Sequence, residues 1–353
     1  MNAPHKIRLT EYSHGGGCGC KIAPAVLTEI LAATPIRGLP ADLLVGTQTA
    51  DDAAVYRLND AQAVVATTDF FTPIVDDPYD FGRIAATNAL SDVYAMGGRP
   101  IFALAVVGMP LDKLPMGVIG RILQGGEAVC TEVGIPVAGG HSIDTLEPIY
   151  GLVALGLVHP EHVKRNDTGR DGDVLVLGKP LGVGVLSAAL KKGGLAHAGY
   201  AAMIETTTKL NTPGEALARL PGVHAMTDVT GFGLAGHLLE MCRGAGLAAQ
   251  IRLDALPVVP EALEWARQGV KTGASDRNWK SYGAEVELAT AAPAATHELA
   301  RVLLTDPQTS GGLLVACAPQ AEAAVLAEFA RGGFADARAI GRLAAGAPRV
   351  LVR

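Results

Sequence analysis

Aromatic and charged residues are scarce in this chain. Aromatic residues make up 5% of the 353 residues and charged residues 18%, whereas hydrophobic residues make up 49%. Such a composition excludes a disordered chain and predicts a packed globular protein. The formal net charge of −6 argues against a general nucleic-acid binder, which would need a basic surface. No nucleic-acid partner is therefore expected, and a phosphate ligand would need local lysines, backbone amides or a metal.

Long hydrophobic runs are also missing. The longest, at residues 101–109 and 149–158, are far shorter than a membrane span, and residues 1–10 contain no apolar core of signal-peptide length. The five cysteines are odd in number and irregularly spaced, which makes a disulfide scaffold improbable at this size. We therefore expect a protein of the cytoplasm without a membrane partner.

Short strands and amphipathic helices mix in both halves of the sequence, which predicts an α/β or α+β protein of two domains. A charged stretch at 159–173 is the expected boundary, giving a segment at 1–50, a domain at 51–160 and another at 161–353. The expected strands are 53–58, 63–67, 101–109, 135–138, 149–158, 174–178 and 313–316. The expected helices are 24–33, 81–96, 117–133, 185–192, 200–210 and one opening near residue 231.

The N-terminal segment combines glycines with reactive side chains. Gly15-Gly16-Gly17 precedes Cys18-Gly19-Cys20-Lys21, and three consecutive glycines predict a segment that is mobile without a ligand. A cysteine close to a lysine is expected to have a lowered pKa and to be a better nucleophile, and Lys21 is also a candidate phosphate clamp. Two alternatives stay open. One is a structural metal site using His14, although the zinc spacing is incomplete, and the other is an inert tail.

Aspartates stand at strand ends and helix starts throughout the sequence. They are Asp51, Asp52, Asp69, Asp92 and Asp228. Carboxylates are the hard oxygen ligands that Mg²⁺ takes, and Mg²⁺ would bridge a polyphosphate. Any single aspartate is more often a turn or helix-cap residue, but several with similar neighbours favour a shared magnesium site. Asn88 lies four residues before Asp92 and shares its helix face.

Glycine-rich stretches offer two further candidates. Residues 231–236 match G-x-G-x-x-G with Asp254 at a suitable distance. However, Asp228 would place a carboxylate where a dinucleotide needs its pyrophosphate, so close backbone packing explains these glycines better. Gly139-Gly140-His141-Ser142 follows an expected strand, and its backbone amides would suit a nucleotide, with a plain tight turn as the alternative. No Walker A motif is present, since Gly178-Lys179 is followed by proline.

Together these motifs closely resemble the selenophosphate synthetases (selenide, water dikinases). The similarity runs from about residue 7 to the C-terminus. The residues that carry it are 13–21 (SHGGGCGCK), 51–55 (DDAAV), 67–71 (TTDFF), 81–89 (FGRIAATNA), 138–144 (AGGHSID), 226–233 (MTDVTGFG) and 306–312 (DPQTSGG). The resemblance implies the α+β, two-domain fold of aminoimidazole-ribonucleotide synthetase, with a flexible glycine-rich N-terminal segment. It also implies a homodimer joined through the N-terminal sheets.

The resemblance further implies an enzyme that converts ATP, selenide and water into selenophosphate, AMP and phosphate. Cys18 matches the family's catalytic cysteine and Lys21 its essential lysine. The implied Mg²⁺ ligands are Asp52, Asp92 and Asp228. The implied nucleotide contacts are Lys21, Thr49, Ala50, Asp51, Asp69, Asp92, Gly140, His141 and Ser142.

Two competing functions stay in view. One is another ATP-dependent synthetase of the same fold, which would form ADP rather than AMP. The other is a non-catalytic selenium or metal carrier that binds nucleotide without turnover. A selenium-delivery protein is also a candidate partner. Whether Cys18 bonds to selenium or only completes a lid is left open by the sequence.

Overall fold

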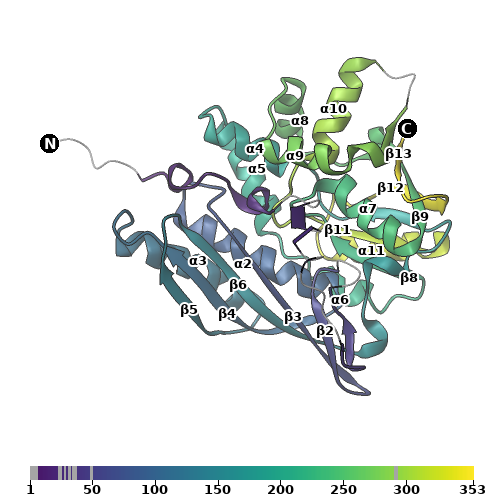
Figure 1. The fold of residues 1–353 in the computed structure, drawn as a ribbon, viewed down its shortest axis with the longest axis horizontal. Coiled ribbons are helices and arrows are strands. Elements are labelled where there is room, and N and C mark those ends of the chain that lie inside the picture. The colour runs from purple at the N-terminus through teal and green to yellow at the C-terminus, as the bar shows by residue number, and fades with distance from the viewer. Residues whose placement is uncertain are drawn as a thin grey trace.

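The computed structural model describes residues 7–22, 26–27, 29–30, 33, 38–47, 51–289 and 293–353. They form two domains, each built on a sheet that carries helices (Figure 1), and this confirms the α+β class. The helix predicted at 24–33 lies partly outside the described residues, and the candidate residues Thr49 and Ala50 lie wholly outside them. None of the described helices has both the length and the apolar character needed to cross a membrane.

The N-terminal domain contains a six-stranded sheet in the order β1-β2-β3-β6-β4-β5. Neighbouring strands are antiparallel except β4 and β5, which are parallel. The strands are β1 (Leu43–Val45), β2 (Ala54–Asn59), β3 (Gln62–Phe71), β4 (Arg99–Met109), β5 (Val137–Asp144) and β6 (Ile149–Val158). Burial alternates along β3, because successive side chains of a strand point to opposite faces.

Helix α2 (Pro78–Ala95) is the central element of the molecule. Asp77 caps its N-terminus through the Asp80 amide, and Pro78 occupies its first turn, where a missing amide hydrogen costs nothing. Most of its residues are buried, because it contacts α3 (Met116–Glu132), strands β3 and β6, and elements of the C-terminal domain. Side chains on α2 can therefore reach both domains.

The C-terminal domain contains a seven-stranded sheet in the order β10-β13-β9-β12-β7-β11-β8. Its strands are β7 (Val174–Leu177), β8 (Val223–Asp228), β9 (Leu247–Ile251), β10 (Val286–Leu288), β11 (Leu313–Cys317), β12 (Arg338–Ala345) and β13 (Val350–Val352). Its helices are α4 (Val183–Lys191), α5 (His197–Thr208), α6 (Pro213–Leu217), α7 (Gly233–Ala245), α8 (Pro260–Arg267), α9 (Gly273–Tyr282), α10 (Ala294–Thr305) and α11 (Glu322–Arg331). Separate apolar clusters pack α7 with α10 and α6 with α11 against the sheet.

Short 3-10 helices complete the chain. They are η1 (Leu9–Tyr12), η2 (Gly17–Cys20), η3 (Pro160–His162), η4 (Asn166–Thr168), η5 (Leu253–Ala255), η6 (Gly283–Glu285) and η7 (Pro319–Ala321).

The predicted elements are largely confirmed in the N-terminal half. The helices expected at 81–96 and 117–133 are α2 and α3, each starting slightly earlier. The strand expected at 135–138 was wrongly placed, because β5 begins at Val137 and includes residues 139–142, which were expected to form a loop. No element was predicted between α7 and β11, where the structure has β9, β10 and α8 to α10.

Gly125 on α3 allows the close crossing of α2 and α3. A Cβ atom at Gly125 would lie 2.1 Å from the Tyr79 carbonyl oxygen, whereas one at Gly120 on the same helix would meet nothing within 4 Å. We expect Gly125→Ala to destabilise the protein by about 1–3 kcal/mol, because the backbones must separate. Gly120→Ala is the control and should be neutral or stabilise by up to about 1 kcal/mol. Urea denaturation measures both, and equal effects would contradict the packing described.

Candidate active site

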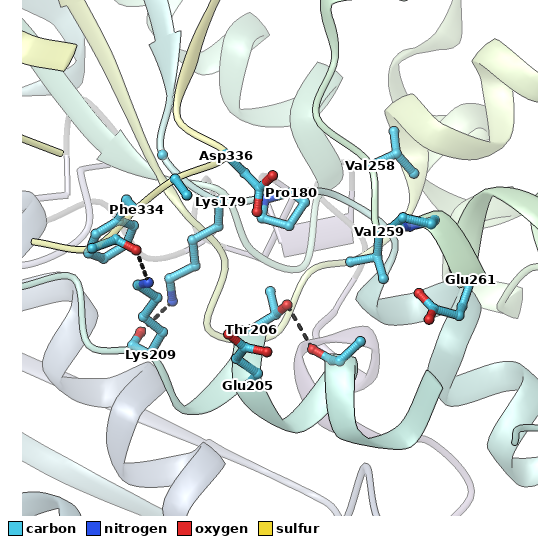
Figure 2. A pocket seen from close by; sticks show the side chains of 15 residues that line it. Lys179, Pro180, Glu205, Thr206, Lys209, Val258, Val259, Glu261, Phe334 and Asp336 are labelled. Atoms are coloured by element: carbon cyan, nitrogen blue, oxygen red, sulfur yellow. Dashed lines mark hydrogen bonds between the residues drawn. The ribbon is translucent and has the colours of Figure 1, made fainter. Parts of the chain in front are cut away.

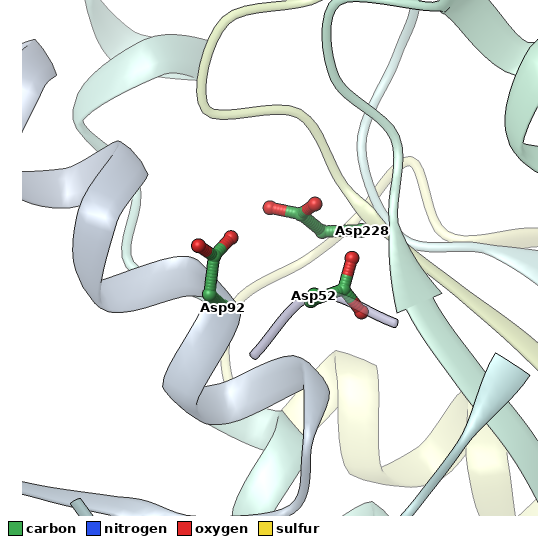
Figure 3. Close-up of side chains that lie close together, drawn as sticks. All are labelled: Asp52, Asp92 and Asp228. Atoms are coloured by element: carbon green, nitrogen blue, oxygen red, sulfur yellow. The ribbon is translucent and has the colours of Figure 1, made fainter. Parts of the chain in front are cut away.

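Three carboxylates from different parts of the chain meet between the domains. Asp52 lies just before β2, Asp92 lies on α2, and Asp228 ends β8 (Figure 3). Each offers one oxygen, and these three oxygens lie within 4.8 Å of one another. We refer to Asp52, Asp92 and Asp228 as the acidic triad. Burial, followed by the charges of neighbouring aspartates, raises the pKa of Asp52 and of Asp92 well above the usual range, and burial also raises the pKa of Asp228.

Each carboxylate of the triad accepts a hydrogen bond from a hydroxyl group on one of its oxygens. The donor–acceptor pairs are Thr227–Asp52 at 2.9 Å, Thr67–Asp92 at 2.5 Å and Ser91–Asp228 at 2.5 Å. Within the part of the chain that the structure describes, Asp52 Oδ2 is buried without a hydrogen-bond partner. Oriented carboxylates that keep an oxygen available form a donor set suited to a hard divalent cation.

Lys21 lies beside the triad and is held by Asp69 of β3. The Lys21 Nζ is 3.2 Å from Asp69 Oδ2, and the same oxygen accepts a 2.7 Å hydrogen bond from Asn88 Nδ2. Burial acts to lower the pKa of Lys21, but the charges of Asp69, Cys18 and Asp92 outweigh it and raise that pKa well above its usual value. The ammonium is therefore charged. Because the Lys21 side chain is still 35% exposed, it can meet an anionic ligand.

Cys18 lies in η2 and is almost fully buried, with 1% of its surface exposed. Its backbone amide donates to Thr309 Oγ1 at 2.9 Å, and its Sγ lies 3.2 Å from Asn88 Oδ1. Burial raises the pKa of the Cys18 thiol well above its usual value, although Lys21 acts to lower it. The lowered pKa expected from the sequence is therefore wrong for this conformation, because burial outweighs the neighbouring charge.

The flexibility expected of the N-terminal segment is not confirmed. Residues 7–22 pack against both domains, and the tightest approach is at Gly17, where φ is +54°. A Cβ atom at Gly17 would lie 2.3 Å from Thr309 Oγ1 and 2.8 Å from Ile74 Cδ1. On the other side, a Cβ atom at Gly231 would lie 2.5 Å from the Cys18 carbonyl oxygen. This agrees with close packing, rather than dinucleotide binding, as the reason for the glycines at 231–236.

The loop at 306–312 supports the cysteine from the C-terminal domain. Ser310 has a φ of +51°, and its amide donates to Asn88 Oδ1 at 2.7 Å. Earlier in the loop, the Gln308 side chain accepts hydrogen bonds from the amides of Gly182 and Val183 at the start of α4, and Asp306 accepts one from Gly184. Burial raises the pKa of Asp306 to about 7. Asn88 thus connects Cys18, Asp69 and this loop. The sequence signals for Asn88 were its four-residue spacing from Asp92 and its place in the 81–89 motif.

Lys179 holds the loop at 306–312 in place and lines a separate cavity of about 210 Å³ (Figure 2). The Lys179 Nζ donates to the carbonyl oxygens of Ser310 at 2.7 Å and Lys209 at 2.6 Å. Burial lowers the pKa of Lys179 to about 7. The cavity is lined by no member of the acidic triad, so Lys179 contributes to the site through the loop.

Other predicted nucleotide contacts lie apart from the triad. Gly140, His141 and Ser142 are on β5, which is separated from β3 by two strands, and they line a cavity of about 540 Å³ at the exposed sheet edge. The Asp51 carboxylate accepts a hydrogen bond from the Asn166 amide at 2.8 Å. It therefore links the chain before β2 to the connection between the domains.

Similarity to known proteins extends over nearly the whole chain. The family described as AIR synthase related protein matches with its N-terminal domain at residues 50–158 and its C-terminal domain at residues 170–352. The selenide, water dikinase of Burkholderia pseudomallei (strain K96243) is 68% identical over 343 residues, covering 97% of this chain and 96% of the relative. That of Pseudomonas straminea is 65% identical over 347 residues, covering 98% and 96%.

Solved structures support the fold at much lower identity. Thiamine-monophosphate kinase from Stenotrophomonas maltophilia K279a has a TM-score of 0.64 at 22% identity, covering 93% of this chain and 95% of its own. The hydrogenase maturation protein HypE in complex with ATP has a TM-score of 0.64 at 19% identity, covering 86% and 85%. These likenesses show a common fold.

The acidic triad predicts how stability should depend on pH and on magnesium. Because the pKa values of Asp52 and Asp92 are raised on folding, the folded state binds more protons than the unfolded state above about pH 4. Stability in a chelator should therefore fall as pH rises from about 4 to neutrality, and Mg²⁺ should restore it by an increment that grows with pH. Thermal unfolding with EDTA or Mg²⁺ measures this increment.

Two variants make this measurement specific. Asp92→Asn should lose most of the Mg²⁺ increment, whereas Asp254→Asn, at an exposed aspartate outside the triad, should keep it. An increment that is the same at every pH, or that survives in Asp92→Asn, would show that the cation binds elsewhere.

Proposed function

Because the chain belongs to the AIR synthase related protein family, as one of its selenide, water dikinases, we propose that it makes selenophosphate from ATP, selenide and water and releases AMP and phosphate. The observation that carries this proposal is the position of the Cys18–Lys21 loop. It lies against Asp69 and Asn88, beside the acidic triad. Phosphoryl transfer to an anion needs this combination of cation ligands, a fixed ammonium and a cover against water.

In this proposal the acidic triad holds Mg²⁺. The three nearby oxygens and the unpartnered, buried Asp52 Oδ2 support that fit. When bound, the cation neutralises the charge of the phosphate oxygens. Thr227, Thr67 and Ser91 keep the carboxylates turned toward it.

Lys21 is proposed to bind the phosphates, with Asp69 fixing the direction of its ammonium. Selenide is already a strong nucleophile at neutral pH, so the residues need to align two anions rather than remove a proton. Cys18, held by Thr309 and Asn88, closes the site at the place where the acceptor would approach. Transfer of the γ-phosphoryl group to selenium leaves ADP, whose β-phosphate is then hydrolysed in the closed site.

The remaining nucleotide contacts are proposals of the same kind. Asp92 belongs to the triad, Asp69 holds Lys21 beside it, and Asp51 directly precedes Asp52 in the chain. Thr49 and Ala50 precede them directly in the sequence but lie outside the described residues. Gly140 to Ser142, on β5, are remote from the triad in one chain, and we connect their nucleotide role with assembly.

We also propose a homodimer joined at the β5 edge of the N-terminal sheet. An exposed edge strand has backbone groups that can pair with a strand of another chain. Exposed apolar side chains also cluster at this edge. The exposed residues are Leu111, Met116, Ile143 and Leu146, and several of them line the cavity next to Gly140. Such a patch is better explained by a second copy of the chain than by solvent.

The cytoplasm is the proposed compartment, supported by the cysteines. All five are free, as expected where thiols are kept reduced. A selenium-delivery protein stays a proposed partner, with no surface assigned to it.

Phosphorus NMR tests the proposed reaction. The protein with Mg-ATP and selenide, kept anaerobic, should give AMP, phosphate and a new signal for phosphorus bonded to selenium. Lys21→Met should lower this turnover roughly 100-fold or more, because an ammonium aimed at the developing charge is lost. Lys271→Met, which breaks a surface ion pair with Asp276, is the control and should be active.

Two results would redirect the proposal. ADP as the end product, or turnover independent of selenide, would favour another ATP-dependent synthetase of this fold. ATP binding without turnover would favour a carrier. Full selenide-dependent turnover in Cys18→Ser would exclude an essential thiolate and leave Cys18 as part of the cover.

The dimer is tested by a matched pair of surface variants. Ile143 on the edge strand β5 is 56% exposed, and Leu58 on β2, near the other edge of the same sheet, is 55% exposed. Ile143→Glu should weaken self-association at least about tenfold, because two like charges would be buried across the interface, whereas Leu58→Glu should leave it unchanged. Sedimentation velocity measures the association. A dimer that tolerates Ile143→Glu would place the interface elsewhere.

A further inference from the structure

Ser91 precedes the triad residue Asp92 on α2, but its side chain forms hydrogen bonds with residues of the C-terminal domain. Its hydroxyl lies 2.5 Å from Asp228 Oδ2 and 2.7 Å from Asn211 Nδ2. Ser91 and Asn211 are each only 1% exposed, so water does not substitute for either contact. Asn211 lies in the connection between α5 and α6 of the C-terminal domain.

The contact between Asn211 and Gly311 determines which atom donates in each of these hydrogen bonds. Asn211 Nδ2 also lies 2.8 Å from the carbonyl oxygen of Gly311. A carbonyl oxygen only accepts, so the atom facing it must be the amide nitrogen. That nitrogen carries two hydrogens and only donates, so Ser91 Oγ accepts the second one. The single hydroxyl hydrogen of Ser91 is then directed to Asp228.

We propose that Ser91 and Asn211 are positioning residues that hold Asp228 in the orientation needed for Mg²⁺. This rests on the proposed magnesium site. The hydrogen bond from the Ser91 hydroxyl to Oδ2 fixes the rotation of the Asp228 carboxylate, which lies within reach of the other two members of the triad. Partners of metal ligands commonly set metal affinity in this way.

The same chain of hydrogen bonds links the metal site to the packing of the two domains. Ser91 belongs to the N-terminal domain, whereas Asn211, Asp228 and Gly311 belong to the C-terminal domain. Gly311 lies two residues after Thr309, which accepts a hydrogen bond from the Cys18 amide. Among the residues that the structure describes, none forms a hydrogen bond with the buried Asn211 Oδ1. An unpaired buried oxygen destabilises the folded protein. The role of the Asn211 side-chain nitrogen as a fixed donor explains why an amide is present there despite this cost.

Two substitutions separate the direction of the hydrogen bonds from simple packing. Ser91→Ala removes one oxygen from a helix and favours helix formation, so folding is retained. Asn211→Asp has nearly the same shape but cannot donate from a carboxylate, so it would draw the Ser91 hydrogen away from Asp228. Asn278→Asp is the matched control, because Asn278 is also buried and its Nδ2 donates to the carbonyl oxygens of Gly231 and Thr305.

Binding of Mn²⁺ alone to the full chain, followed by electron paramagnetic resonance of the free ion, is the test. We expect Ser91→Ala and Asn211→Asp to weaken Mn²⁺ binding about 10- to 100-fold, and Asn278→Asp to stay within about twofold of wild type. In turnover assays the first two should raise the Mg²⁺ concentration needed for half activity, while kcat at saturating Mg²⁺ recovers to within a few-fold.

The outcomes distinguish this inference from the magnesium site itself. If Asp228→Asn abolishes Mn²⁺ binding but folded Ser91→Ala and Asn211→Asp bind like wild type, the positioning role is overturned and the site stands. If wild type and Asp228→Asn bind Mn²⁺ equally, both proposals are overturned. Thermal unfolding of each variant confirms that it is folded, and Ser91→Ala alone decides if Asn211→Asp is not.

Discussion

The repulsion among three carboxylates, of which Asp92 and Asp228 are buried and Asp52 is half-buried, is the constraint on which the rest of this structure depends. Asp52 and Asp92 come from one domain and Asp228 from the other, so any group that neutralises them also holds the domains together. Like charges at this distance, away from water, cannot all stay ionised without a counter-charge. The charged Lys21 and the three hydroxyl donors offset part of that cost. A divalent cation would supply the remaining counter-charge, and because its ligands come from both domains, its binding would be coupled to domain packing.

The cover over this centre is built from contacts between distant segments. Asn88 accepts from the Cys18 thiol and the Ser310 amide and donates to Asp69, so one buried amide aligns the cysteine, the lysine's partner and the C-terminal loop. Lys179 holds the same loop from behind through the Ser310 carbonyl oxygen. Because the bond between the Ser310 amide and Asn88 joins the two domains, this arrangement around Cys18 requires both domains to be folded and packed.

Local patterns predicted much of this arrangement. The helix predicted at 81–96 and the four-residue step from Asn88 to Asp92 placed these two side chains on one helix face, and the resemblance of the motifs grouped Asp52, Asp92 and Asp228. Spacing could not predict contacts across 120 residues, such as that between Ser91 and Asn211. The lowered pKa predicted for Cys18 was also wrong. The burial that raises this pKa comes from the packing of other segments rather than from the neighbours of Cys18 in sequence.

A crystal structure of the protein grown with Mn²⁺, with the anomalous signal of manganese recorded, tests the central claim most directly. We expect a manganese peak in contact with carboxylate oxygens of Asp52, Asp92 and Asp228, so that both domains ligate the ion. A peak held by residues of one domain only, or no peak at the triad while manganese occupies other sites, would contradict the view that this charge cluster joins the domains and forms the catalytic centre.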